Sequence, residues 1–152
     1  MLYFPKIELI SNNEGEIILS RALIQTANQS PQNVALNGII ALGSVQRRFG
    51  CACRLSGNAI EVSESGYYLA DITVTVTPTE IGNVTIALFE DGVAVQGATN
   101  TGSVAAVGDT TTIPIVATLR KGCCDVNASN LTVVLTEGPG VVNNISTRVQ
   151  KA

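Results

Sequence analysis

The sequence contains no histidine and no tryptophan among its 152 residues, and only 14% of its residues are charged. Without histidine, neither a Ser-His-Asp triad nor a Cys-His pair can be built, and the commonest zinc ligand is missing. The adjacent acids Glu90 and Asp91 fall in a predicted hairpin turn, where solvated acids are usual. A calcium site using Asp91, Asp109 or Asp125 stays open, because oxygen ligands often gather on loops, although no spaced calcium-binding loop is present. We therefore expect a protein that is not an enzyme and that holds no metal or cofactor.

Basic residues are also scarce, since nine Lys and Arg stand against twelve Asp and Glu, for a net charge of −3. No basic residue lies between Leu55 and Leu119, although acids continue to occur there. Binding to a phosphate backbone requires clustered cations, so we expect neither nucleic acid nor an anionic membrane surface as a partner. Hydrophobic residues make up 45% of the chain. So much apolar side chain with so little charge predicts burial between subunits.

Export and membrane signals are missing from the sequence. Met1–Ile10 has no basic region before its apolar residues, and Pro5 and Glu8 interrupt the apolar run. No window approaches the roughly 18 apolar residues of a membrane span. We expect the protein to be made in a cytoplasm without a signal peptide.

Short strands with turn residues between them dominate the chain after residue 33. Residues Tyr68–Thr77 alternate between one apolar and one largely polar face, which is typical of a half-buried antiparallel strand. The same alternation through Val84–Leu88 runs into Asp91-Gly92, a pair that favours a tight hairpin, so Val93–Gln96 should pair back. Further strands are expected at Val34–Leu42, Ala59–Val62, Ile113–Leu119, Leu131–Thr136 and Val141–Val149. The pattern predicts an all-β fold, an antiparallel β-sandwich or jelly roll.

The first part of the chain differs from the rest. A polar segment broken by proline, Asn28–Asn33, is the best candidate for a domain boundary. We expect residues 1–32 to form an N-terminal docking arm and residues 33–152 to form the sandwich. Within the arm, the pattern at Arg21–Ala27 fits either a helical turn or a strand.

The four cysteines allow several interpretations. Cys51 and Cys53 are one residue apart and therefore share a face if they lie on a strand, whereas Cys123 and Cys124 are adjacent. Buried free thiols are the ordinary expectation for a protein made in a cytoplasm. Disulfides within or between subunits, formed after release into an oxidising medium, stay open, and so does a zinc site.

A few exposed side chains are candidate interface residues. Tyr67 and Phe89 fall on the faces opposite the predicted core, where an aromatic side chain can anchor a partner. The doubled arginine Arg47-Arg48 can bind carboxylates of a neighbouring protein, with a solvated loop as the alternative. Tyr3 and Phe4 are the corresponding candidates in the arm.

Several segments together resemble the trimeric jelly roll of the C1q/TNF family. They are Ile60-Glu61-Val62, Gly66-Tyr67-Tyr68, Val84–Leu88, Asp91–Val95 and Leu119–Gly122. In that family the Gly-Tyr begins a core strand and the Asp-Gly forms a hairpin. The resemblance implies a homotrimer.

A second resemblance is to small structural proteins of tailed phages and prophages. Its segments are Arg48-Phe49-Gly50, Glu90-Asp91-Gly92, Gly122-Cys123-Cys124 and an Asn-rich strand pair at Asn127–Leu135 and Asn143–Arg148. It covers roughly Val34 to Arg148, and the family's cysteine near the core strand has no match at Tyr67 or Tyr68. It implies a protein of the virion surface, a capsid-decoration or head-fibre protein, with the major capsid protein or another scaffold as its partner.

Three alternative functions stay open at this stage. The first is a receptor- or glycan-binding tip module of a phage fibre, with a host-surface glycan as its ligand. The second is a hydrolase of cell-wall glycans that uses Glu61, Glu64 or Asp71. The third is a cellular filament or spore-coat protein.

Overall fold

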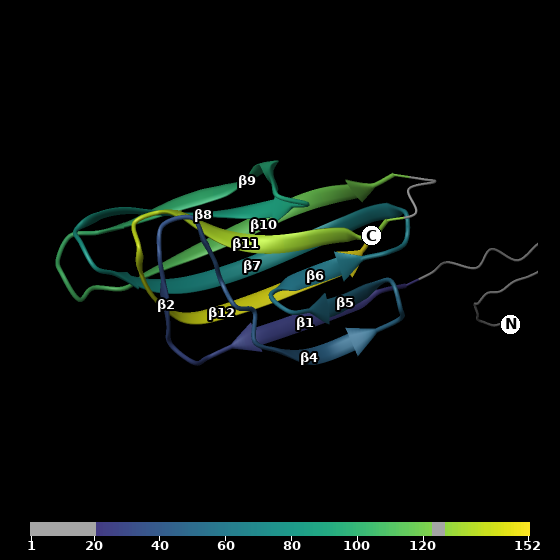
Figure 1. Cartoon of the computed structure of the whole chain (residues 1–152), viewed down its shortest axis with the longest axis horizontal. Coiled ribbons are helices and arrows are strands. Elements are labelled where there is room, and N and C mark those ends of the chain that lie inside the picture. Colours follow the sequence, from purple (N-terminus) through teal and green to yellow (C-terminus); the bar gives the residue numbers. More distant parts are fainter. Residues whose placement is uncertain (1–20, 123–126) are drawn as a thin grey trace, which may run out of the picture.

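The computed structural model describes residues 21–122 and 127–152, and in these ranges the chain contains β-strands and no helix. Two six-stranded antiparallel sheets pack face to face (Figure 1). Sheet A has the order β10 (Thr111–Lys121), β7 (Gly66–Pro78), β12 (Gly140–Lys151), β1 (Leu23–Asn28) and β4 (Ser44–Phe49), with β2 (Gln32–Val34) pairing with β12. Sheet B has the order β5 (Cys53–Ser56), β6 (Ala59–Val62), β11 (Ser129–Glu137), β8 (Gly82–Glu90) and β9 (Val93–Val104), with β3 (Gly38–Ile39) pairing with β11. The predicted all-β sandwich is confirmed.

The core lies between the two sheets and follows the predicted alternation. On β7, every second side chain from Tyr68 to Val76 is almost completely buried, while the intervening side chains point outward. Strand β10 adds apolar side chains from the same sheet, and β8 and β11 contribute them from the facing sheet. The hydroxyl of Tyr68 stays hydrogen-bonded, because it donates to the carbonyl oxygen of Glu64 at 2.7 Å. Period-two patterning therefore produces an apolar core that is lined by both sheets.

The predicted hairpin at Asp91-Gly92 is confirmed. Both residues have positive φ angles, 52° and 83°, and Glu90 pairs with Val93 across the turn. Two positive φ angles match the right-handed twist of the flanking strands, which explains why Gly stands at the second position. After Ala94 the register shifts, because Phe89 pairs with Ala94 whereas Ala87 pairs with Thr99. Strand β9 therefore contains a bulge close to the turn, and beyond it pairing with β8 resumes from Thr99 to Val104.

The edge strands of the two sheets approach each other on both sides of the sandwich. On one side, the side-chain amide of Asn100 on β9 donates to the carbonyl oxygen of Pro114 on β10 at 2.6 Å. On the other side, Arg48 Nε on β4 donates to the carbonyl oxygen of Cys53 on β5 at 2.9 Å. Pro114 stands on an edge strand, where a missing N–H costs little. These contacts cover edge groups that would otherwise be free to pair with other chains.

The structure places the beginning of the sandwich earlier than residue 33. Strand β1 lies inside sheet A between β12 and β4, with Ile24 and Thr26 fully buried. Of the two readings of Arg21–Ala27, the strand is therefore correct, from Leu23 onward. Strand β2 then continues along β12. Burial of alternate residues in β1 makes this segment part of the core, and the expected boundary moves toward the N-terminus. Residues 1–20, which hold most of the expected arm, lie outside the described residues.

Two further expectations about strands are corrected. The apolar run Val34–Leu42 is not one strand, because β2 ends at Val34 and a turn with Asn37 at φ 63° precedes β3. Strand β4 was not predicted, since all six of its residues are exposed and no alternation marks it.

Among the described residues, no helix is long and apolar enough to cross a membrane.

Two buried threonine hydroxyls face each other in sheet A without a hydrogen-bond partner among the described residues. Thr26 on β1 is the register partner of Thr147 on β12, and both side chains are buried. An unsatisfied buried hydroxyl costs about 1–3 kcal/mol, whereas valine has nearly the same shape and no polar atom.

We expect Thr26→Val and Thr147→Val each to raise the free energy of unfolding by about 1 kcal/mol, because each removes an unpaired polar group from the core. Urea unfolding measures the change, followed by far-ultraviolet circular dichroism because the chain has no tryptophan for fluorescence. Thr85→Val is the matched control, because the hydroxyl of Thr85 lies 2.8 Å from that of Thr101 and 2.9 Å from a Glu137 carboxylate oxygen. A loss of stability in the two core variants, equal to that of the control, would contradict the assignment.

Candidate interaction surface

The acids that a hydrolase would need do not converge on one cleft. Each of them forms an ion pair with a different cation: Glu61 with Arg54 at 3.0 Å, Glu64 with Lys151 at 3.1 Å and Asp71 with Arg148 at 2.8 Å. Glu61 lies on β6 of sheet B, whereas Asp71 lies on β7 of sheet A. These carboxylates form separate surface ion pairs, and Glu61 and Asp71 lie on different sheets. They therefore do not flank one common position, as the acid and base of a glycosidase do.

The loop acids considered for calcium are also apart. Asp91 precedes β9 and Asp109 follows it, so the whole strand separates them. One carboxylate oxygen of Asp91 accepts a hydrogen bond from the backbone N–H of Asn130 at 2.9 Å, which fixes the hairpin against β11. Asp125 lies outside the described residues. Residues 21–122 and 127–152 contain no group of three or more potential metal ligands.

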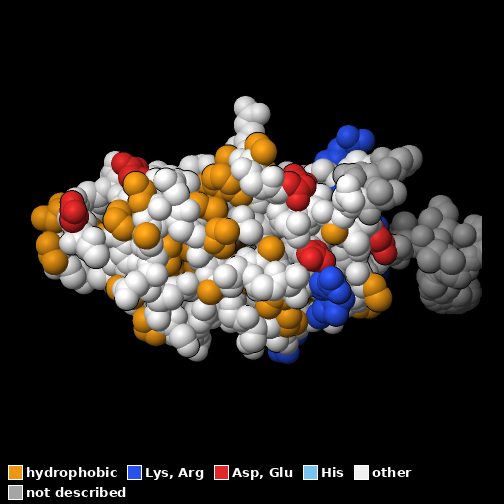
Figure 2. Space-filling model, viewed as in Figure 1, with side chains coloured by type: hydrophobic (Ala, Val, Ile, Leu, Met, Phe, Trp, Pro, Cys, Tyr) orange, Lys and Arg blue, Asp and Glu red, His pale blue; other side chains and the backbone are white. Residues whose placement is uncertain are grey.

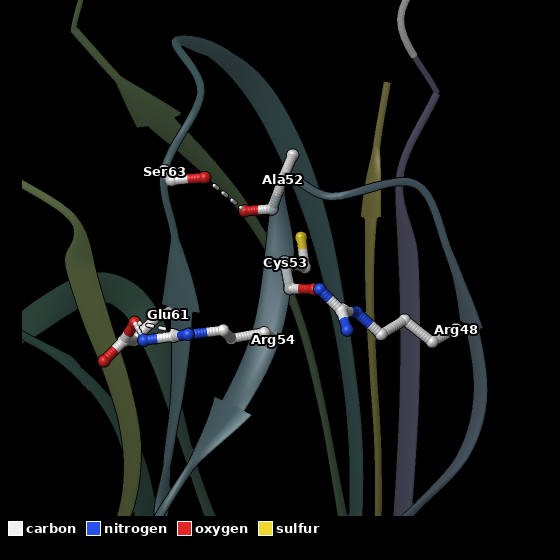
Figure 3. A network of polar contacts seen from close by, with 6 residues as sticks. All are labelled: Arg48, Ala52, Cys53, Arg54, Glu61 and Ser63. Atoms are coloured by element: carbon white, nitrogen blue, oxygen red, sulfur yellow. Dashed lines mark hydrogen bonds and ion pairs between the residues drawn. The ribbon is translucent and has the colours of Figure 1, made fainter.

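A polar network joins β4, β5 and the end of β6 (Figure 3). Arg48 reaches from β4 to the carbonyl oxygen of Cys53, while the backbone N–H and the hydroxyl of Ser63 both donate to the carbonyl oxygen of Ala52, at 2.8 and 3.2 Å. The arginine pair is therefore divided: Arg48 links the two sheets, whereas Arg47 pairs with Gln25 on the outer face of sheet A. The network holds one side of the sandwich closed.

Cys51 and Cys53 are both free, and their surroundings differ. Cys51 is exposed on the turn between β4 and β5, whereas the side chain of Cys53 is buried in the core. Burial raises the pKa of the Cys53 thiol from 9.0 to about 11, against the opposing effect of the nearby Arg48 guanidinium. The fold therefore favours the protonated thiol, and this contribution to stability is complete below pH 9.0 and is lost as the pH rises toward 11. Cys123 and Cys124 lie outside the described residues.

We expect iodoacetamide at pH 8 to alkylate Cys51 at least about tenfold faster than Cys53, because alkylation requires an accessible thiolate. Tandem mass spectrometry of the tryptic peptide that spans residues 49–54 distinguishes the two sites. Labelling in urea is the control and should remove the difference. Equal labelling of the folded protein would show that Cys53 is not held in the core.

The aromatic residues predicted for an interface lie on different sides of the molecule. Tyr67 is exposed on β7, on the outer face of sheet A, whereas Phe89 is half-buried on β8 of sheet B, beside Ala94 and Thr132. The structure therefore does not bring them together into one surface. Tyr3 and Phe4 lie outside the described residues.

Exposed apolar side chains gather instead on the outer face of sheet A. The exposed fractions are 44% for Leu69, 54% for Phe49, 57% for Tyr67 and 73% for Val116. Register connects them across the sheet: Phe49 pairs with Leu23, Leu23 with Gln150, and Gln150 with Leu69. We call Leu23, Phe49, Tyr67, Leu69 and Val116 the apolar face.

Sequence reasoning found only Tyr67 of this set. Leu69 interrupts an otherwise polar series on the outward side of β7, which was a usable signal. Val116 stands between the buried Ile115 and Ala117 in a continuous apolar run, so its outward orientation could be read only from the strand register. Phe49 was hidden because β4 has no alternation.

Charge is distributed unevenly along the sandwich. In Figure 2 the basic side chains lie in the right half of the view, and the opposite end shows hydrophobic and acidic side chains. That opposite end includes Glu80 and Ile81 after β7 and Val107 and Asp109 after β9, all exposed. The last residues of β12 lie at the other end, next to the beginning of β1. There the N–H of Lys151 donates to the carbonyl oxygen of Ala22 at 2.9 Å. The two ends of the molecule therefore offer different chemistry to a partner.

Comparisons with known proteins place this architecture among jelly-roll domains. No family model matches the sequence, and no curated protein matches it. The structure of murine APRIL superposes with a TM-score of 0.68 at 9% identity, over 88% of this chain and 100% of that one. The globular domain of zebrafish complement 1qA gives 0.63 at 7% identity, over 85% and 94% of the two chains. The PRD1 vertex protein P5 gives 0.54 at 13% identity, over 86% and 96%. At such low identity these likenesses establish the fold, a jelly roll of the TNF/C1q type.

Proposed function

We propose that this chain is a non-enzymatic structural protein of a phage particle, which forms a homotrimer on the virion surface as a capsid-decoration or head-fibre protein. The observation that carries the proposal is the apolar face, because four strongly exposed large side chains on one sheet call for a covering partner. The jelly-roll likeness to TNF/C1q-type domains and to a phage vertex protein supports both the self-association and the viral role.

The apolar face suits contact with further copies of the same chain. It spans sheet A from the edge strand β10, which carries Val116, to the edge strand β4, which carries Phe49. Its neighbours on the same face include the neutral Thr118 and Gln150, and also Arg120 beside Tyr67 and Asp71 beside Val116. Asp71 forms an ion pair with Arg148 at 2.8 Å, so this charge would enter the interface with its partner. Stable protein interfaces bury about 1,200–2,000 Å² in total, and each Å² of apolar surface contributes about 25 cal/mol.

The proposed attachment to the particle would use the end of the sandwich where the described chain begins. Residues 1–20 precede β1 there, and the basic side chains are concentrated in the same half. We propose that this end docks on the major capsid protein or another scaffold protein. The acidic and apolar end would then point away from the particle.

We expect the protein to sediment as a species of three times 15.8 kDa at micromolar concentration. Leu69→Asp and Val116→Asp should each give monomers that keep the β-type circular dichroism spectrum, because a carboxylate would be buried without a partner. Val93→Asp is the control, since Val93 is 69% exposed but lies on sheet B. A stable wild-type monomer contradicts the trimer, and variants that remain trimeric contradict the apolar face as its interface.

We expect mass spectrometry to find the chain in density-purified particles from a host strain whose genome encodes it. Deletion of residues 1–20 should leave the β-type spectrum and the trimer intact, because the described sandwich begins after them, and should abolish binding to the particles. Particles that lack the chain contradict the virion role. Binding that survives the deletion contradicts the docking role of this segment.

A further inference from the structure

A polar hollow of about 480 Å³ opens between the turn after β1 and the beginning of β4. Strands β1 and β4 lie at the lower edge of the molecule in Figure 1. It is lined by Ala27, Asn28, Gln29, Ser30, Gly43, Ser44 and Gln46. None of these side chains is charged or aromatic, and most carry an amide or a hydroxyl group. The volume falls within the range of small-molecule sites in proteins.

Local hydrogen bonds hold two amide side chains of the hollow in place. The amide nitrogen of Asn28 donates to the carbonyl oxygen of Ala41 at 3.1 Å, while its oxygen accepts from the N–H of Ser30 at 3.0 Å. The amide nitrogen of Gln46 donates to the hydroxyl of Ser44 at 3.1 Å, which leaves the Gln46 amide oxygen without a partner among the described residues. Groups that are already oriented lose less entropy when a ligand binds.

Other polar groups of the hollow remain available for a ligand. The side chains of Gln29 and Ser30 make no hydrogen bond with any described residue, and both are exposed. Together with the Gln46 oxygen they offer donors and acceptors within one concave surface.

Gly43 brings the two sides of the hollow together. It has a φ of 86°, and a Cβ atom at this position would lie 2.2 Å from the carbonyl oxygen of Ala27 and 2.6 Å from Cβ of Asn28. Only glycine permits such a close approach of the two segments. The backbone itself therefore sets the shape of the hollow.

We propose that this hollow binds a neutral saccharide. A phosphate or carboxylate ligand would require a cation, and no cation lines the hollow. An apolar ligand would require an apolar wall, which Ala27 alone does not form. Sugar hydroxyls donate and accept at once, as do the amide and hydroxyl groups present here.

The absence of an aromatic side chain among the lining residues sets the expected strength. A sugar held by hydrogen bonds without ring stacking should bind one copy with a Kd on the order of 1 mM. The site itself does not depend on oligomerisation. If the proposed homotrimer forms, the three hollows of one trimer would strengthen its binding to a surface that displays many copies of the sugar.

The test is saturation-transfer NMR on the full chain with glucose, galactose, mannose and N-acetylglucosamine, as monosaccharides and short oligosaccharides. At least one should give a signal, and titration of that saccharide should show affinity reduced about tenfold in the double variant Gln29→Ala, Gln46→Ala, because two hydrogen-bonding side chains are lost. Gln96→Ala is the control, since Gln96 is an exposed amide on β9 of sheet B.

Two results would overturn the saccharide site. One is that no saccharide of the panel gives a signal with the folded chain. The other is that the double variant binds as tightly as the wild type, or that Gln96→Ala weakens binding equally. Sedimentation of the same samples reports the oligomeric state separately, so a failure of the trimer is distinguishable from a failure of this site.

Discussion

Packing of the inner surfaces of sheets A and B against each other is the constraint on which the rest of this molecule depends. Side chains from Tyr68 to Val76 on β7 meet Val84, Ile86 and Leu88 of β8 and the facing residues of β11 in a continuous core. The outward positions of the same strands then have to meet solvent or a partner. Because the interior is filled with side chains, whatever the protein binds must be bound on its outer surfaces.

Closure of the sandwich at its edges restricts those surfaces further. The Asn100–Pro114 and Arg48–Cys53 contacts occupy groups at the two open sides, and a bulge interrupts the edge strand β9 near its hairpin. Strand addition at the edges is thereby disfavoured, which leaves the sheet faces as the surfaces for a protein partner. The apolar face on sheet A and the neutral hollow beside β4 are consequently different kinds of site. One offers hydrophobic area to a protein, whereas the other offers hydrogen bonds to a small polar ligand.

Candidate site residues show how far sequence reasoning reached. Tyr67 was predicted correctly as exposed, because alternation through β7 opposes it to the buried Tyr68. Phe89 was grouped with it, yet Phe89 lies on the other sheet, since strand alternation gives a face but not the sheet to which it belongs. Arg47 and Arg48 were treated as one pair, but neighbouring residues of a strand point to opposite sides, and only the folded chain shows that Arg48 reaches Cys53.

The sequence by itself determined the β-class, the buried face of β7 and the Asp91-Gly92 hairpin, because alternation and turn chemistry are local properties that adjacent residues carry. Tertiary structure alone decided that Leu23–Asn28 belongs to the sandwich, that β4 is a strand, and that Phe49, Leu69 and Val116 share one surface. These features arise from pairing between segments far apart in the chain, such as β1 with β12, and the register of such pairing is set by the packing of the whole core.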